Sequence, residues 1–213
     1  MAEETLHVAV IDVGSLSNLG WAVEGPVLNE CGADIDVCVG ALCKALEIGP
    51  LALGFEAPMF VPHGRKRCDL DKGRRGEGDR AFGASVGASV LVKGLMIAQY
   101  VLSALHSRVG TARPTFRWRE QLSAAGDLLL FEAFVSHVGK AVGHIDCARL
   151  ALKRFPGTWE ERASFVSAID EPGILNLLGA ILLRIGWTDD ITVLSEPCLV
   201  VLHKGQAGAR RSL

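Results

Sequence analysis

Three short apolar segments of this chain each end in a carboxylic acid. The acids are Asp12 in HVAVIDVGS, Glu56 in PLALGFEAP and Glu132 in DLLLFEAF. A carboxylate is rarely buried without a partner, because removing its charge from water is unfavourable. The fold must therefore bring these strand ends to a place where the charges are balanced. A shared divalent cation is the simplest partner.

Length and composition limit the kind of protein that carries this site. The chain has 213 residues, of which 49% are hydrophobic, as expected for one compact domain with a buried core. Its formal net charge of -2 gives no overall attraction to nucleic acid, so such a contact must come from a local patch. The six cysteines form no CxxC pair, and the start MAEETLH does not resemble a secretory leader. We therefore expect a cytoplasmic protein without a structural zinc site.

One long apolar run, Gly83 to Leu105, has the length of a membrane span. Lys93 lies at its centre and Gln99 follows, which is unfavourable in a bilayer. We predict a helix buried against a sheet, and no membrane partner.

The first part of the chain predicts three strands, a helix and a fourth strand. The strands are expected over Leu6–Val13, Asn18–Val23, Pro26–Glu30 and Leu51–Phe55, the first three antiparallel. Asp34 is a suitable N-cap for a helix that runs to Ile48 and ends at Gly49-Pro50.

The second part predicts helices separated by a fifth strand. They are a long helix from about Phe82, a strand over Leu128–Phe131, helices over His144–Arg154, Glu160–Ile169 and Pro172–Ile185, and an apolar stretch, Cys198–Leu202, suited to a last strand. This order predicts a single α/β domain over residues 1–213, with a mixed five-stranded sheet flanked by helices. Its core spans about residues 6–155, followed by a helical extension over about 156–213.

Asp12 and Glu56 are the main candidate pair. If the fourth strand lies beside the first, their carboxylates are neighbours, and their mutual repulsion favours a cation between them. Hard oxygen donors of this kind suit Mg²⁺ or Mn²⁺. Two other readings stay open: Asp12 as a turn residue, and Glu56 as a loop cap or partner of an arginine.

Asp146 adds a candidate from a different element. In GHIDCARLALKRF it falls in the first turn of a predicted helix whose small and apolar residues would pack on the sheet. An acid in the first turn is also stabilised by the helix dipole, so simple N-terminal capping is the alternative.

A basic loop, HGRKRCDLDKGRRGEGDR, follows Glu56. Its candidate phosphate-binding residues are Arg65, Lys66, Arg67, Arg74, Arg75 and Arg80. A merely solvated loop is the alternative. A second candidate contact is the segment with Arg113, Arg117 and Arg119, in which Phe116 or Trp118 could stack on a base.

These segments together resemble a known family. The motifs IDVGSLSNLGWAVEG, LALGFEAPMF with RKRCDL, LLLFEAF and HIDCARLAL are similar to an uncharacterised family of predicted nucleases with a ribonuclease H-like fold, closest to the Holliday-junction resolvase branch. The likeness spans about Val8 to Leu152. Three departures are Glu56 where the family has Asp, no proline after Glu132, and Gly143 where resolvases often carry another acid.

The resemblance implies phosphodiester hydrolysis of DNA or RNA by two metal ions. Asp12 would contact both ions, Glu56 and Asp146 would hold one each, and Glu132 would be a further ligand or orient water. His144 or His137 would protonate the leaving oxygen or aid product release, and a histidine with only a structural role is the alternative. By analogy with resolvases, the apolar C-terminal helices would form a homodimer interface.

Two other functions stay open. One is a catalytically inactive ribonuclease H-like scaffold that binds a partner. The other is an actin-like phosphotransferase, which a strand followed by D-x-G-S also suits, although no second phosphate motif follows.

Overall fold

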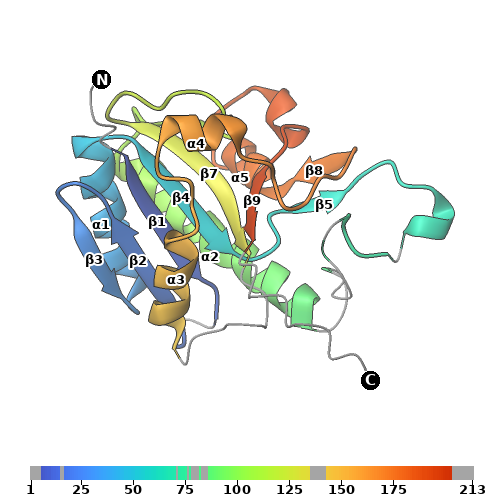
Figure 1. Ribbon diagram of the computed structural model, residues 1–213, viewed down its shortest axis with the longest axis horizontal. Helices are drawn as coiled ribbons and strands as arrows, with labels where there is room; N and C mark the ends of the chain where they lie inside the picture. Colours follow the sequence, from blue (N-terminus) through green and yellow to red (C-terminus); the bar gives the residue numbers. More distant parts are fainter. Residues whose placement is uncertain are drawn as a thin grey trace.

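The protein is built around a seven-stranded mixed sheet (Figure 1). The computed structural model describes residues 6–14, 17–70, 72–75, 77, 82, 86–134 and 143–202. The strands lie in the order β3-β2-β1-β4-β7-β6, and β9 also pairs with β7. Their bounds are β1 His7–Asp12, β2 Gly20–Glu24, β3 Asn29–Gly32, β4 Leu51–Glu56, β6 Arg113–Thr115, β7 Asp127–Phe134 and β9 Leu199–Leu202.

The predicted α/β class is confirmed, and the predicted count of five strands is wrong. β1, β2 and β3 are antiparallel, whereas β4, β7, β6 and β9 continue the sheet in parallel. β6 pairs with Asp127–Leu129 and β9 with Phe131–Phe134, so together they form one interrupted edge along β7. β6 escaped prediction because three residues with a central proline show no alternation.

Two helical layers cover the sheet. The buried residues of α1 (Ile35–Ile48), α2 (Val86–Arg108) and α5 (Leu177–Arg184) share a core cluster with Ile11, Leu53 and Phe55. On the opposite face, α3 (His144–Leu152) and the segment around α4 (Trp159–Ser164) pack with Val10, Ala52 and Phe131. Successive strand residues point to opposite faces, so odd-numbered residues of β1 and β4 face α1 and α2, and even-numbered ones face α3.

α1 lies where the sequence predicts it, whereas α2 begins at Val86, after the predicted start at Phe82. The Asp34 side chain accepts hydrogen bonds from the backbone N–H groups of Asp36 and Val37, and so caps α1. α2 buries Ile97, Val101 and Leu105 toward the sheet. By length and composition Gly87–Arg108 could cross a membrane, but the core helix of a globular protein passes the same test.

The C-terminal part contributes strands to the fold and is not the separate helical extension that we expected. The helix predicted over Pro172–Ile185 is wrong in its first half: β8 (Ile174–Asn176) pairs with β5 (Phe60–Pro62), and α5 begins after Asn176. Asn176 explains the boundary, because its side chain accepts from Gly179 N–H as an N-cap. β9 confirms the predicted last strand and joins the main sheet, and two short 3₁₀ turns, η1 (Arg67–Asp69) and η2 (Ile191–Leu194), complete the described elements.

Candidate functional site

Asp12 and Glu56 end two neighbouring parallel strands and lie side by side. They are register partners in the β1–β4 pair, and adjacent strands run about 4.8 Å apart. Both face the α3 side of the sheet, and their exposed fractions are only 1% and 7%. The structure thus brings the main candidate pair together at one sheet edge, in a setting where two negative charges are shielded from water.

His144, the first residue of α3, contacts Asp12 directly. Its Nδ1 lies 2.7 Å from Asp12 Oδ2, and its side chain is 27% exposed. Because the carboxylate accepts, Nδ1 carries the proton and donates, which leaves Nε2 as the second ring nitrogen. The pair therefore has a buried acid and a partly accessible imidazole.

Gly20 makes this close approach possible. It is the register partner of Asp12 on β2, and a Cβ placed on it would lie 2.2 Å from the carbonyl carbon of His144. Any side chain there would push the start of α3 away from the sheet. Gly20 thus shapes the site, although its place within an apolar strand segment gives no sign of this in the sequence.

Asp146 lies in the first turn of α3, two residues beyond His144, and it is exposed. Gly143, rather than an acid, is the N-cap, and it offers no side chain to the helix. Within the described ranges, no three His, Cys, Asp or Glu side chains are grouped closely enough to hold a metal ion. Asp146 therefore belongs to the neighbourhood of Asp12, but a ready-made three-donor site is not part of the described structure.

Glu132 lies on the other face of the sheet. Its register partner on β4 is Phe55, not Glu56, so its side chain points toward the α1 and α2 layer. It is fully buried and accepts from both terminal nitrogens of Arg74, each at 2.7 Å, and from Met59 N–H at 2.9 Å. The structure does not place Glu132 with Asp12 and Glu56, which corrects its expected role as a ligand or a water-orienting group.

Arg74 is a structural residue instead of a phosphate contact. Its guanidinium also pairs with Glu77 at 2.9 Å and lies 4.6 Å from the centre of the Phe60 ring. Burial lowers the pKa of Arg74, but the charges of Glu132 and Glu77 outweigh that effect and raise it. The Glu132–Arg74–Glu77 network, as we call these three residues, thus fastens the loop to the sheet.

Arg65 also binds groups of the protein itself. It binds Glu171 at 2.9 Å and donates to the carbonyl groups of Asp69, Lys72 and Gly73. The predicted substrate contacts therefore divide into two kinds: Arg65 and Arg74 hold the loop, whereas Lys66, Arg67 and Arg75 are exposed. In the described part of the chain, these last three side chains pair with no acid. Arg80 and His137 fall outside the described residues.

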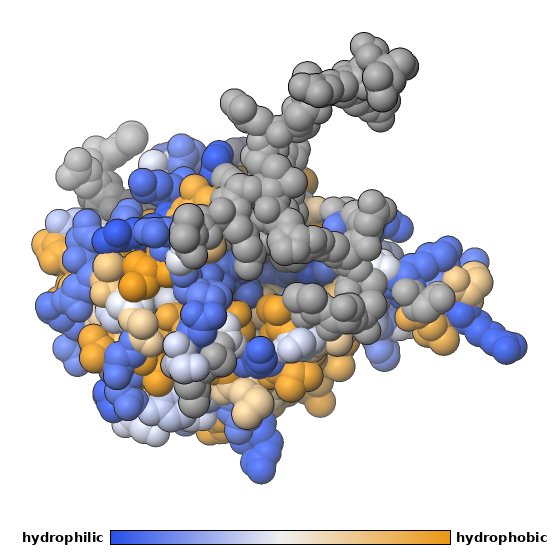
Figure 2. All heavy atoms as spheres, turned by 90° about the horizontal axis from the view of Figure 1, so that it is seen from below, coloured by the Kyte–Doolittle hydropathy of each residue, from blue (hydrophilic) through white to orange (hydrophobic). Residues whose placement is uncertain are grey.

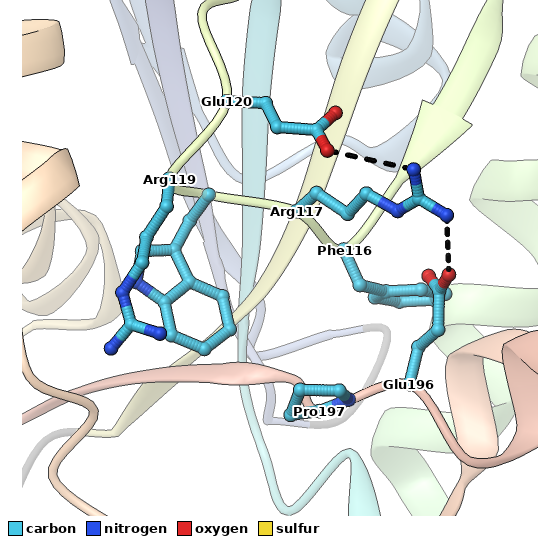
Figure 3. Close-up of a pocket in the computed structure, with 7 residues that line it drawn as sticks. Phe116, Arg117, Arg119, Glu120, Glu196 and Pro197 are labelled. Atoms are coloured by element: carbon cyan, nitrogen blue, oxygen red, sulfur yellow. Dashed lines mark hydrogen bonds and ion pairs between the residues drawn. The ribbon is translucent and has the colours of Figure 1, made fainter.

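The second predicted contact surrounds a hollow of about 290 Å³ where β6 leaves the edge of the sheet and β9 enters it (Figure 3). Arg117 points between Glu120 and Glu196, at 3.5 Å from each, and Arg119 lies over the Trp118 ring at 4.9 Å. Phe116 and Trp118 line this hollow but are largely buried, and Arg119 lies over the Trp118 ring, so little ring surface is open to a base. Base stacking on these two aromatics stays a prediction that their burial disfavours.

Comparison with protein-family models, curated proteins and solved structures finds no match for this chain.

Proposed function

We propose that this protein is a metal-dependent nuclease of ribonuclease H-like type, which hydrolyses phosphodiester bonds at the edge where β1 and β4 end. The observation that carries the proposal is the in-register pair Asp12 and Glu56, buried on one face of the sheet beside the start of α3. The antiparallel β1-β2-β3 unit next to parallel β4 and β7 agrees with the fold that the sequence resemblance implies.

The donor chemistry of this pair suits Mg²⁺ or Mn²⁺. Both ions prefer hard oxygen ligands, and Mg²⁺ is often held by one or two carboxylates, with water and substrate phosphate completing its shell. The Asp12 and Glu56 carboxylates therefore suit such an ion. In the two-metal form of the reaction, Asp12 would contact both ions, with Glu56 and Asp146 holding one each.

A divalent cation bound there supplies charge neutralisation for the phosphodiester and activation of water. The protein's own residues supply position and proton transfer. The Asp12 carboxylate fixes the His144 ring through Nδ1, so Nε2 is the nitrogen that can exchange a proton with the leaving oxygen. The buried setting of Asp12 limits competition from water for its oxygens.

Exposed cations on two elements are candidates for phosphate contacts. Lys66, Arg67 and Arg75 lie on the loop that follows β5. Arg149 lies three residues after Asp146 on the same side of α3, and Lys153, the C-cap residue of α3, follows four residues later. Arg149 donates to Cys31 Sγ, which holds it against β3. A strand bound along α3 would thus lead toward Asp12.

A catalytically inactive scaffold is the second candidate function. Two observations favour it: Glu132 is committed to Arg74, and the described residues contain no three-donor metal group. Such a protein would keep Asp12 and His144 as a structural pair.

Metal binding and cleavage separate the two candidates. The wild-type protein is titrated with Mn²⁺ by calorimetry and incubated with branched DNA, single-stranded DNA, RNA and RNA/DNA hybrids in Mg²⁺ or Mn²⁺. We expect binding and cleavage of at least one substrate, both lost in Asp12→Asn. Glu120→Gln changes an exposed acid away from the pair and serves as the matched control. Absence of Mn²⁺ binding, or equal binding by Asp12→Asn, would favour the scaffold.

A further inference from the structure

Hydrophobic side chains are not confined to the interior of this protein, and several reach the surface in the view of Figure 2. Three of the exposed large ones form a single row on α2: Val92, Met96 and Tyr100, which are 56%, 69% and 48% exposed. Residues four apart lie on the same side of a helix, so the row runs along the outer side of α2. Solvated rows of this kind mark interaction surfaces more often than isolated apolar residues do.

The residue types along this row are similar on both sides of Met96. Met96 has an apolar residue four positions away on each side, Val92 and Tyr100, and a small serine seven positions away on each side, Ser89 and Ser103. If a second α2 runs the opposite way about Met96, Val92 lies opposite Tyr100 and Ser89 opposite Ser103, so apolar residues meet apolar residues and small residues meet small ones. Such reciprocal contacts are what a twofold interface requires.

We propose that the outer row of α2 is a homodimer interface, in which α2 packs antiparallel against α2 of a second copy with the twofold axis at Met96. This inference is independent of the proposed nuclease activity. The 23 residues of α2 give a helix of about 35 Å, which is long enough for an extended contact. Val92 of one copy would then meet Tyr100 of the other.

Charge placement selects a second copy as the occupant. Lys93 is exposed beside Val92 at one end of the row, and Asp36 of α1 accepts a hydrogen bond from the Tyr100 hydroxyl at the other end. Antiparallel pairing brings Lys93 of each copy to Asp36 of its mate, so the dimer gains two opposite-charge contacts. A parallel arrangement would instead place Lys93 beside Lys93.

We expected the C-terminal helices to form the homodimer interface, but α5 has no apolar face available for one. Its apolar residues Leu178, Ile181 and Leu182 belong to the core of the same chain. α2 lies between α1 and α5, and its outer row is the exposed side of that layer.

The first test measures self-association by sedimentation velocity across a dilution series of the full chain. We expect a dimer that Met96→Glu weakens at least about tenfold, because two charges would meet near the axis. Ile191→Glu is the matched control, since Ile191 is 70% exposed but lies on η2. A wild-type protein that stays monomeric at high concentration would overturn the proposal, as would equal effects of the two variants.

A cysteine test fixes the register. In a background with Cys31→Ser and Cys68→Ser, which removes the two exposed native thiols, Met96→Cys should form an intermolecular disulfide under mild oxidation. Val92→Cys should not, because antiparallel pairing separates the two copies of residue 92 by about 12 Å along the axis, beyond disulfide reach. Cross-linking of Val92→Cys with itself would refute the antiparallel register.

Charge reversal tests the contacts between Lys93 and Asp36, and lipid vesicles test whether α2 binds a membrane instead. Lys93→Asp and Asp36→Lys should each weaken the dimer, and the double variant should restore part of the loss. If the double variant fails to recover while circular dichroism shows it folded, the end contacts are wrong. If the protein instead floats with phosphatidylcholine vesicles and Met96→Glu abolishes that binding without changing self-association, α2 contacts membrane and the dimer proposal falls.

Discussion

The Glu132–Arg74–Glu77 network gives the sharpest prediction, because it separates a structural acid from a metal ligand. The side chains of Glu132 and Arg74 are completely buried, and that of Glu77 is 2% exposed. Replacing Arg74 by Met leaves two buried carboxylates without their cation. Removing one partner of a buried ion pair destabilises a protein by about 3–5 kcal/mol. Since a domain has only about 5–15 kcal/mol of stability, this is a large fraction of the total.

Glu132→Gln should be milder than Arg74→Met. The amide oxygen can still accept from Met59 N–H or Arg74, and Arg74 keeps Glu77 as a charged partner. We expect a loss of about 1–3 kcal/mol, the range for an unsatisfied buried polar group. For a chain of this length, the Arg74→Met loss corresponds to a fall in Tm of about 6–20 °C.

Urea unfolding followed by tryptophan fluorescence measures these losses, and Mn²⁺ calorimetry is done on the same variants. Glu30→Gln is the control, because Glu30 pairs with Lys44 at the surface and should change stability by less than about 1 kcal/mol. A metal ligand would behave differently from a structural acid: its neutralisation removes Mn²⁺ affinity and relieves repulsion in the metal-free protein. If Glu132→Gln abolishes Mn²⁺ binding while its unfolding midpoint stays the same or rises, the structural assignment of Glu132 is refuted.

Two further predictions concern the ends of β1. Burial lowers the pKa of His7 and outweighs the opposing effect of the Pro50 backbone, so the unfolded chain takes up a proton first as the pH falls. The free energy of unfolding should therefore be constant above about pH 6.5 and fall below that pH by up to about 1.4 kcal/mol per pH unit. His7→Leu should remove this pH dependence in urea titrations at pH 5–7. An unchanged pH dependence would contradict the reasoning. At the other end of β1, Gly20→Ala would place a Cβ 2.2 Å from the His144 carbonyl carbon. It should lower the free energy of unfolding by about 1–3 kcal/mol and shift the His144 ring signals in NMR spectra. Gly40→Ala is the control, because its Cβ position has open space around it, and it should have neither effect.

The strands that carry Asp12 and Glu56 were predictable because their sequence signals are local. Each has a continuous apolar run of strand length followed by a turn, and the helix between them has both an Asp34 N-cap and a Gly49-Pro50 stop. These local signals do not say whether β4 pairs with β1 or with β3. The structure places β4 beside β1 and brings Asp12 and Glu56 into register.

The side of the sheet on which Glu132 lies was not predictable, because register is a property of two strands. A shift of one residue between β4 and β7 would move Glu132 to the other face, and the run DLLLFE is apolar on both faces and gives no sign of the register. The role of Arg74 was hidden for a similar reason. It is 58 residues from Glu132 in the chain, and within a basic loop it looks the same as its exposed neighbour Arg75.

The two faces of the sheet balance their acids in different ways, and this difference supports a role for Asp12 beyond the fold. On the α2 face, Glu132 receives a permanent cation from the chain's own Arg74, together with a backbone donor. On the α3 face, no lysine or arginine among the described residues pairs with Asp12, whose partner is the imidazole of His144. An arginine remains charged at any physiological pH, whereas an imidazole can donate its hydrogen bond without carrying a charge. Among the described residues, the charge of Asp12 therefore has no permanent cation beside it and is available to a divalent ion, whereas the charge of Glu132 is already balanced by Arg74.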